Sequence, residues 1–120
     1  MTVQRAPVGA GPSGRRLWRA VTAEFDLDEH ERALLLALVR QVDRLDQLER
    51  LIVAEGLTVT GHGSVKIHPA VVEARQTAIA VARISAALRL PAGDEDGQAV
   101  NDPRPQRRSG VRGVYSVGAA

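Results

Sequence analysis

The sequence predicts a mainly α-helical protein with a short N-terminal helix and a long antiparallel helical hairpin. A small β-ribbon is expected at the tip of the hairpin, and the whole chain is expected to be oligomeric. Two long segments place apolar residues every three or four positions, which is typical of helices. The segment between them, Gly56–Arg75, holds two short β-type runs around a glycine-rich turn. Aromatic residues make up only 2% of the 120 residues, so aliphatic side chains must build the core, which favours helix packing.

The first element is a short helix that follows an extended N-terminal arm. Residues 1–13 are rich in glycine, proline and small side chains, and we expect a flexible arm there. Ser13 can cap a helix over residues 14–25. One apolar stripe runs along this helix, which we expect to dock on the hairpin; its members are Leu17, Trp18, Val21 and Phe25.

The second element is a long helix that begins at a capping box formed by Asp28 and Glu31. It extends to about Glu55, with Gly56 just past its end. About 28 residues with a rise of about 1.5 Å each give a length of about 42 Å. Its apolar stripe resembles a coiled-coil seam and comprises Leu34, Leu35, Leu38, Val42, Leu45, Leu48 and Ile52. Charged side chains off this stripe predict a solvated face; they include Arg40, Asp43, Arg44 and Asp46.

A β-ribbon is expected next, because residues 57–60 and 65–67 flank a turn in which Gly61 and Gly63 permit positive φ. The third helix begins at Pro69, where proline is well tolerated, and extends to about Leu90, before Pro91.

The third helix carries apolar side chains around most of its circumference, so it must be covered on several sides. A chain of this size cannot cover that surface alone, and we therefore infer oligomerisation. Residues 14–91 are predicted to form one helical domain for oligomerisation and DNA binding. Residues 92–120, rich in glycine, proline, aspartate and arginine, are predicted to form a flexible C-terminal tail.

Composition excludes several classes of protein. The chain has no cysteine, which excludes disulfides and thiolate metal sites. No apolar run reaches the roughly 18–20 residues of a membrane span, and no leader resembles a signal peptide. The sequence therefore predicts a soluble cytoplasmic protein without a membrane partner.

The net charge of +2 hides an asymmetry along the chain. Residues 1–20 and 103–120 each carry four arginines and no acid, whereas residues 21–102 hold all 14 acids against 8 bases. Basic ends on an acidic body indicate contact with a polyanion. The alternative is that the basic ends only aid solubility.

The strongest candidate site is the basic side of the N-terminal helix, where Arg15, Arg16 and Arg19 can meet phosphates while the apolar stripe faces the body. The alternative is that these arginines pair with nearby acids: Glu24, Asp26, Asp28 or Glu29. Further candidates for DNA contact are Lys66 on the ribbon and four arginines of the tail, which could instead bind an acidic partner surface: Arg104, Arg107, Arg108 and Arg112.

No catalytic, cofactor or metal site is predicted. His62 and His68 lack the three or four ligands that a zinc site needs, and are interpreted as a turn residue and a helix-start residue. Ser64 beside His62 has no third orienting group, and the glycines around His62 lack the context of a phosphate loop. The sequence therefore predicts a binding protein, not an enzyme.

Residues 14–91 resemble the small subunit of tailed-phage terminases, in the group with a long helical hairpin. The N-terminal part of the resemblance is carried by Gly14, Arg15, Leu17, Trp18, Phe25, Leu27, Glu31, Leu34, Leu35 and Asp43. The rest is carried by Glu55-Gly56-Leu57, the glycine turn, His68-Pro69, Arg75, Arg83, Leu88, Leu90 and Pro91.

This resemblance implies a ring-forming adaptor without catalytic residues, working in the cytoplasm of the phage host. Such an adaptor binds double-stranded viral DNA and recruits and regulates the large subunit, which carries the ATPase and nuclease. The N-terminal helical region is shorter than a helix-turn-helix, which leaves open whether the chain reads sequence or only grips phosphates. The alternative function is a non-viral, dimeric helical DNA-binding regulator or interaction module.

Overall fold

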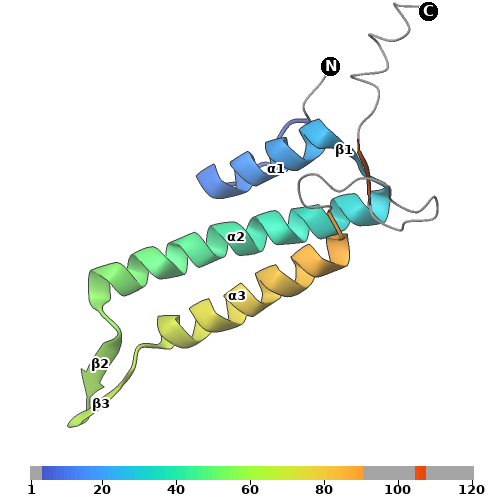
Figure 1. Ribbon diagram of the computed structural model, residues 1–120. Coiled ribbons are helices and arrows are strands. Elements are labelled where there is room, and N and C mark those ends of the chain that lie inside the picture. The colour runs from blue at the N-terminus through green and yellow to red at the C-terminus, as the bar shows by residue number, and fades with distance from the viewer. Residues whose placement is uncertain (1–3, 91–104, 108–120) are drawn as a thin grey trace, which may run out of the picture.

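The computed structural model describes residues 4–90 and 105–107, which form three helices and two small antiparallel sheets (Figure 1). The helices are α1 (Pro12–Glu24), α2 (Glu29–Glu55) and α3 (Pro69–Leu88). The strands are β1 (Phe25–Asp26), β2 (Thr58–Gly61), β3 (Ser64–Ile67) and β4 (Gln106–Arg107). The mainly helical class and the small two-stranded sheet predicted from the sequence are confirmed.

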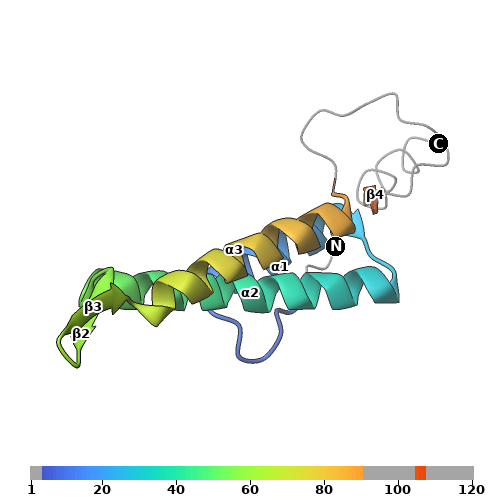
Figure 2. The same ribbon diagram turned by 90° about the horizontal axis from the view of Figure 1, so that it is seen from below.

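The long helix α2 is the centre of the fold. In Figure 1, α1 and α3 lie on opposite sides of α2, and the ribbon of β2 and β3 projects beyond the end of α2. Figure 2 shows the same ribbon at one extreme of the molecule and the α1–α2 connection at the other. The principal extents, 76 × 29 × 24 Å, describe an elongated molecule.

The core lies at the end of the molecule where all three helices meet. Its buried members come from α1, β1, α2 and α3: Trp18, Val21, Phe25, Leu35, Leu38, Val39 and Leu88. The buried residues of α2 end at Val39, in the first half of the helix. Farther along α2, the predicted apolar stripe is only half-buried; its members there are Val42, Leu45, Leu48 and Ile52. The apolar side chains in the distal half of the molecule are therefore less buried than those in the core.

Local sequence signals explain how α2 begins and ends. The backbone N–H of Asp28 donates to the Glu31 carboxylate at 2.7 Å, and the capping box is complete. The helix ends at Gly56, whose φ of +90° is a conformation that favours glycine.

The ribbon forms around a two-residue turn. His62 (φ +51°) and Gly63 (φ +75°) both occupy the left-handed region, as a type I′ hairpin turn requires. Its right-handed twist matches that of the two strands, so Thr60 pairs with Val65 and Gly61 with Ser64.

The third helix ends two residues earlier than the sequence predicts. Pro91 is a stop signal that would allow the helix to reach Leu90, but α3 ends at Leu88 and is closed by Arg89 in the left-handed conformation, with φ +58°. The backbone N–H of Arg89 still donates to the carbonyl of Ser85, so the last turn is satisfied.

A short pairing joins the segment between α1 and α2 to the C-terminal strand β4. β1 pairs antiparallel with β4, with Phe25 opposite Arg107 and Asp26 opposite Gln106, and Pro105 is buried. Residues 105–107 lie within the predicted tail over 92–120, and their composition carries no periodic pattern that would indicate a strand. The rest of that predicted tail lies outside the described residues.

Candidate nucleic-acid interface

Helix α1 presents two faces of different character. Its inner face buries Gly14, Trp18, Val21 and Thr22, while Leu17 of the predicted stripe is only half-buried. The outer face carries Arg15, Arg16 and Arg19 beside small alanines, and all three arginines are exposed. Docking through the inner face thus turns the arginines outward.

The N-terminus of α1 is capped by a side chain of α2. The Asp43 carboxylate accepts from the backbone N–H of Gly11 at 2.6 Å and from that of Gly14 at 2.7 Å. A carboxylate that accepts from free N–H groups at a helix N-terminus also complements the helix dipole. Asp46 accepts a further hydrogen bond from the hydroxyl of Ser13.

Two sequence predictions are corrected by this cap. Ser13 does not cap a helix that starts at residue 14, because α1 already begins at Pro12 with Gly11 as the N-cap. Asp43 and Asp46 do not belong to a purely solvated face, because they bind α1 and are half-buried. Sequence reasoning missed Asp43 because its partners lie about thirty positions away.

The arginines of α1 are free of acidic partners within the described residues. The Arg15 guanidinium donates to the carbonyl of Ala10 at 2.5 Å, and that of Arg16 donates to the Ser13 hydroxyl at 3.2 Å. Neither they nor Arg19 form an ion pair with an acid in the described part of the chain. The alternative, that nearby acids neutralise the arginines, stays a prediction, since Glu24 and Asp26 take part in further interactions.

The N-terminal segment adds a basic residue beside α1. Gln4, Arg5 and Ala6 line an open groove together with Arg19, Ala20 and Ala23 of α1. Gln4 is held by a hydrogen bond from Arg32 of α2, and Ala6 packs against the core. Within the predicted arm over residues 1–13, Pro12 and Ser13 belong to α1, and Ala6 and Ala10 pack against the core.

Arg5 is absent from the predicted site, although it belongs to the N-terminal run of arginines without acids. That run is the signal that could have included it. The structure brings Arg5 and Arg19 to one groove, with small alanines between them, so a phosphate chain could approach both guanidinium groups.

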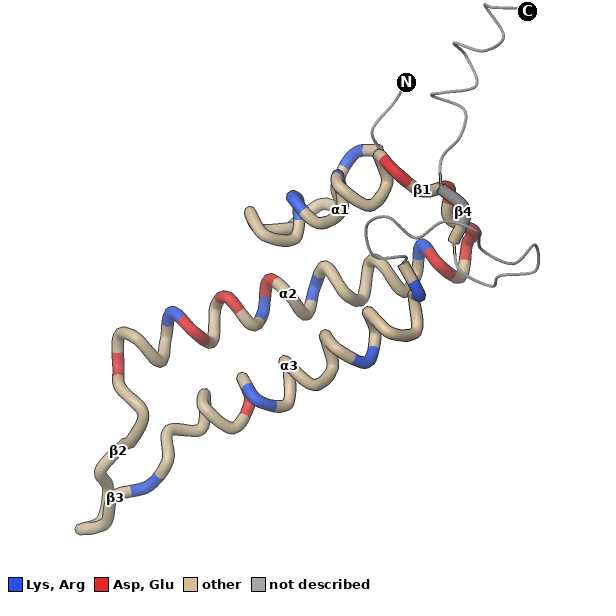
Figure 3. Tube along the Cα trace, viewed as in Figure 1, with Lys and Arg blue, Asp and Glu red and all other residues tan. Residues whose placement is uncertain are grey.

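Of the other candidate residues, the structure describes only Lys66 and the backbone position of Arg107. Lys66 lies on β3 at the far tip of the molecule, remote from α1 (Figure 3). Arg107 lies in β4, whose backbone pairs with β1. The remaining tail candidates lie outside the described residues: Arg104, Arg108 and Arg112.

His68 joins the two long helices at the base of the ribbon. Its Nδ1 accepts the backbone N–H of Ala70 at 2.9 Å, so it caps α3, and its Nε2 lies 2.7 Å from Glu55 Oε1 at the end of α2. Because Nδ1 is the acceptor, the ring proton sits on Nε2 and is donated to Glu55. The interpretation of His68 as a helix-start residue is confirmed.

Replacing His68 with alanine is expected to lower the free energy of unfolding by about 1–2 kcal/mol, because the α3 cap and the bond to Glu55 both disappear. His68→Asn supplies a side-chain oxygen that can cap α3 in place of Nδ1, but it cannot reach Glu55. This variant should therefore be more stable than His68→Ala and less stable than the natural chain. Urea unfolding followed by circular dichroism measures the effect. His30→Ala, at an exposed position of α2, is the matched control; an equal destabilisation in the control would contradict the assigned role.

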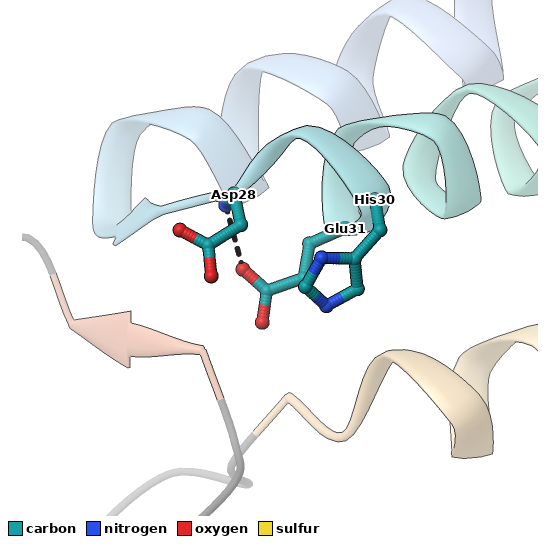
Figure 4. A group of neighbouring side chains, drawn as sticks. All are labelled: Asp28, His30 and Glu31. Carbon is teal, nitrogen blue, oxygen red and sulfur yellow. Dashed lines mark hydrogen bonds between the residues drawn. The ribbon is translucent and has the colours of Figure 1, made fainter.

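A group of potential metal ligands occurs at the start of α2. Asp28, His30 and Glu31 each offer one ligand atom, and these atoms lie within 4.8 Å of one another (Figure 4). Sequence reasoning from His62 and His68 missed this trio, which a D-x-H-E pattern could have signalled. Asp28 and Glu31 already serve the capping box, so the hydrogen bonds of the fold account for their positions.

One small cavity lies between the N-terminal segment and α2. Its volume is about 220 Å³, and its lining includes Gly9, Leu36, Arg40 and Asp43. Pockets for small-molecule ligands usually hold about 300–1,000 Å³. The cavity is below that range, and Asp43 is engaged in capping α1.

Comparison of the chain with protein-family models, with curated proteins and with solved structures found no match. None of the described helices has both the length and the apolar character needed to cross a bilayer.

Proposed function

We propose that this chain is the small subunit of a phage terminase. In this proposal it is a ring-forming adaptor that binds double-stranded viral DNA through the outer face of α1. It recruits and regulates a large subunit with ATPase and nuclease activity, in the cytoplasm of the phage host. The chain itself contributes binding surfaces and no catalytic residue.

The observation that carries the DNA-binding part is the outer face of α1. Arg15, Arg16 and Arg19 are exposed there without an ion pair to a described acid, and Arg5 lines the same groove as Arg19. Guanidinium groups bind phosphate oxygens in a fixed fork, and their interaction with DNA does not need a base-reading element. The face therefore suits the phosphate backbone of a duplex.

The distribution of exposed apolar side chains supports assembly. With the exception of Val8, every large exposed hydrophobic residue of the described chain lies between Leu51 and Ile79. This region contains the end of α2, the ribbon and the first half of α3. Such a concentration of exposed apolar surface marks an interface rather than a solvated arm.

Light scattering coupled to size-exclusion chromatography tests the assembly. We expect a mass of several protomers at micromolar concentration, because the distal apolar surface has no cover within one described protomer. A dimer would favour a non-viral helical regulator, and a monomer would contradict the proposal.

Binding to a fluorescent DNA duplex tests the DNA-binding part of the proposed function. Fluorescence anisotropy over a series of salt concentrations should give an affinity that falls steeply with salt, with a slope of about −0.9 for each neutralised phosphate. Absence of binding at low salt would contradict DNA recognition by this chain.

A further inference from the structure

The ribbon at the tip exposes both of its backbone edges and several apolar side chains. Every residue of β2 and β3 is exposed, and within the described chain the two strands pair only with each other. An isolated two-stranded hairpin is marginally stable in water. A third strand or a covering surface would stabilise it.

The hydrogen-bond pattern shows which backbone groups are left over. The N–H of His68 donates to the carbonyl of Leu57 at 2.8 Å, so these opposite residues form a hydrogen-bonded pair. Hydrogen-bonded and non-hydrogen-bonded pairs alternate along an antiparallel ladder. The backbone groups that point outward are therefore those of Thr58 and Thr60 on β2, and of Val65 and Ile67 on β3.

The two edges carry little of the protection that usually prevents strand addition: Lys66 on β3 is their one charged side chain, and β2 has none. Val65 is 67% exposed, Ile67 58% and Leu57 63%, and Lys66 is the only charged residue in β2 or β3. Charged side chains, prolines and bulges are the usual protection of a free edge, and the two strands have no proline. The edges thus suit another neutral, β-branched strand.

The described C-terminal strand, β4, does not provide that strand. β4 lies beside β1, at the opposite end of α2 from the ribbon (Figure 1). The 27 residues of α2 separate the two ends by about 40 Å. No other strand of the described chain pairs with the ribbon.

We propose that the outer edge of β2 in one copy pairs antiparallel with the outer edge of β3 in the next copy. This inference rests on the assembly in the proposed function and identifies one of its contact surfaces. β2 and β3 run in opposite directions, so neighbouring copies that point the same way present antiparallel edges to each other. Each copy uses both edges, and closure of the ring leaves no free edge.

Pairing of β2 with β2, or of β3 with β3, is the competing arrangement. It would join two copies by a two-fold axis and leave the other edge of each ribbon open. Head-to-tail pairing uses both edges of every ribbon and leaves neither of them open.

Cysteine cross-linking distinguishes these arrangements, because the natural chain has no cysteine. Thr58→Cys and Thr60→Cys variants place a thiol on β2, and Val65→Cys and Ile67→Cys place one on β3. A β2 variant is co-expressed with a β3 variant that carries a larger tag. The purified assembly is oxidised and analysed by non-reducing gel electrophoresis.

We expect a disulfide-linked band of mixed size for at least one of the four combinations, and no such band for any single variant. Equivalent thiols in a head-to-tail sheet are two strand spacings apart, about 9.5 Å, which exceeds the reach of a disulfide. Disulfides in single variants would overturn the head-to-tail arrangement. Absence of a mixed band in all four combinations would overturn edge pairing.

A proline variant tests the backbone contribution directly. Thr60→Pro removes an N–H that points outward and leaves the ladder within the ribbon intact, whereas Thr60→Val keeps this N–H. In the assembly that combines Thr58→Cys with Val65→Cys, Thr60→Pro should reduce the yield of mixed disulfide at least tenfold. Thr60→Val should leave this yield unchanged. Equal yields with proline and valine would overturn the proposal.

The failure of this inference is separable from the failure of the proposed function. A mixed disulfide in an assembly that does not bind DNA would contradict the DNA-binding function and leave the ribbon contact standing. An assembly that binds DNA without any mixed disulfide would contradict the ribbon contact alone.

Discussion

Replacing Arg15, Arg16 and Arg19 together with alanine is expected to weaken duplex DNA binding by about 10- to 100-fold at low salt. This magnitude follows from about 0.5–1 kcal/mol for each guanidinium–phosphate interaction that is removed, with about 1.4 kcal/mol for a factor of ten. The slope of affinity against salt should also become shallower, by about 0.9 for each phosphate that is no longer neutralised. Fluorescence anisotropy over a salt series measures both quantities.

The matched control removes the same charge from another exposed surface. Arg40, Arg44 and Arg50 lie on α2, away from the outer face of α1, and their triple replacement with alanine changes the net charge equally. If both variants lose affinity to the same extent, binding depends on overall charge and not on the α1 face. Conversion of the three α1 arginines to lysine should restore most of the salt slope, because the charges return.

A Gly14→Ala substitution is expected to destabilise the docking of α1 by about 3 kcal/mol or more. A Cβ at this position would overlap Asp43 Oδ2 and lie 2.7 Å from Val39 Cγ1, which forces α1 away from α2. The separation also breaks the hydrogen bonds from Gly11 and Gly14 to Asp43, and each such bond to a charged group contributes about 1.5–3 kcal/mol. Alanine favours an isolated helix over glycine by about 1 kcal/mol, so a decrease in stability would identify the close approach as its cause.

Trp18 reports this undocking directly. It is the single tryptophan of the chain, it is 5% exposed, and its indole nitrogen has no partner among the described residues. Its fluorescence should shift to longer wavelength when α1 leaves α2, and the urea midpoint should fall. Asp43→Ala should also shift the emission to longer wavelength and lower the urea midpoint. Glu49→Ala, which replaces another acid of α2, should change the free energy of unfolding by less than about 0.5 kcal/mol. Unchanged emission in the Gly14 variant would contradict the assigned packing.

The two predictions are coupled through the position of α1. Gly14→Ala retains every arginine, yet it releases the helix that holds three of them in a fixed arrangement. DNA affinity should therefore fall in this variant as well, because flexible arginines lose more conformational entropy on binding. Full affinity in an undocked variant would show that the arginines act independently of the fold.

Much of the fold could be predicted because its signals are local. The capping box of Asp28 and Glu31, the end of α2 at Gly56 and the turn at His62 and Gly63 each depend on residues within a few positions of one another. Hydrogen bonds over such distances are formed by the same short segment wherever it lies, so the sequence alone specifies them. The mainly helical class and the ribbon between the long helices follow from these signals.

The candidate site could be predicted in part for the same reason. Helical spacing correctly placed Arg15, Arg16 and Arg19 on the exposed side of a helix whose other side is apolar. Spacing within one helix does not reveal which acids lie near the arginines, and it could not place Arg5 beside Arg19. These relations depend on how separate segments pack.

Short-range patterns in the chain are thus sufficient for the helices, for the beginnings of α2 and α3, and for the turn of the ribbon. The cap of α1 by Asp43 arises only from the packing of α1 on α2, since the partners Gly11 and Gly14 lie 32 and 29 positions away. That cap requires α1 to approach α2 so closely that the position of Gly14 has no room for a side chain. The pairing of β4 with β1 is of the same kind. Both join segments far apart in the chain, and their geometry is set by the distance and angle between packed elements, which no local pattern encodes.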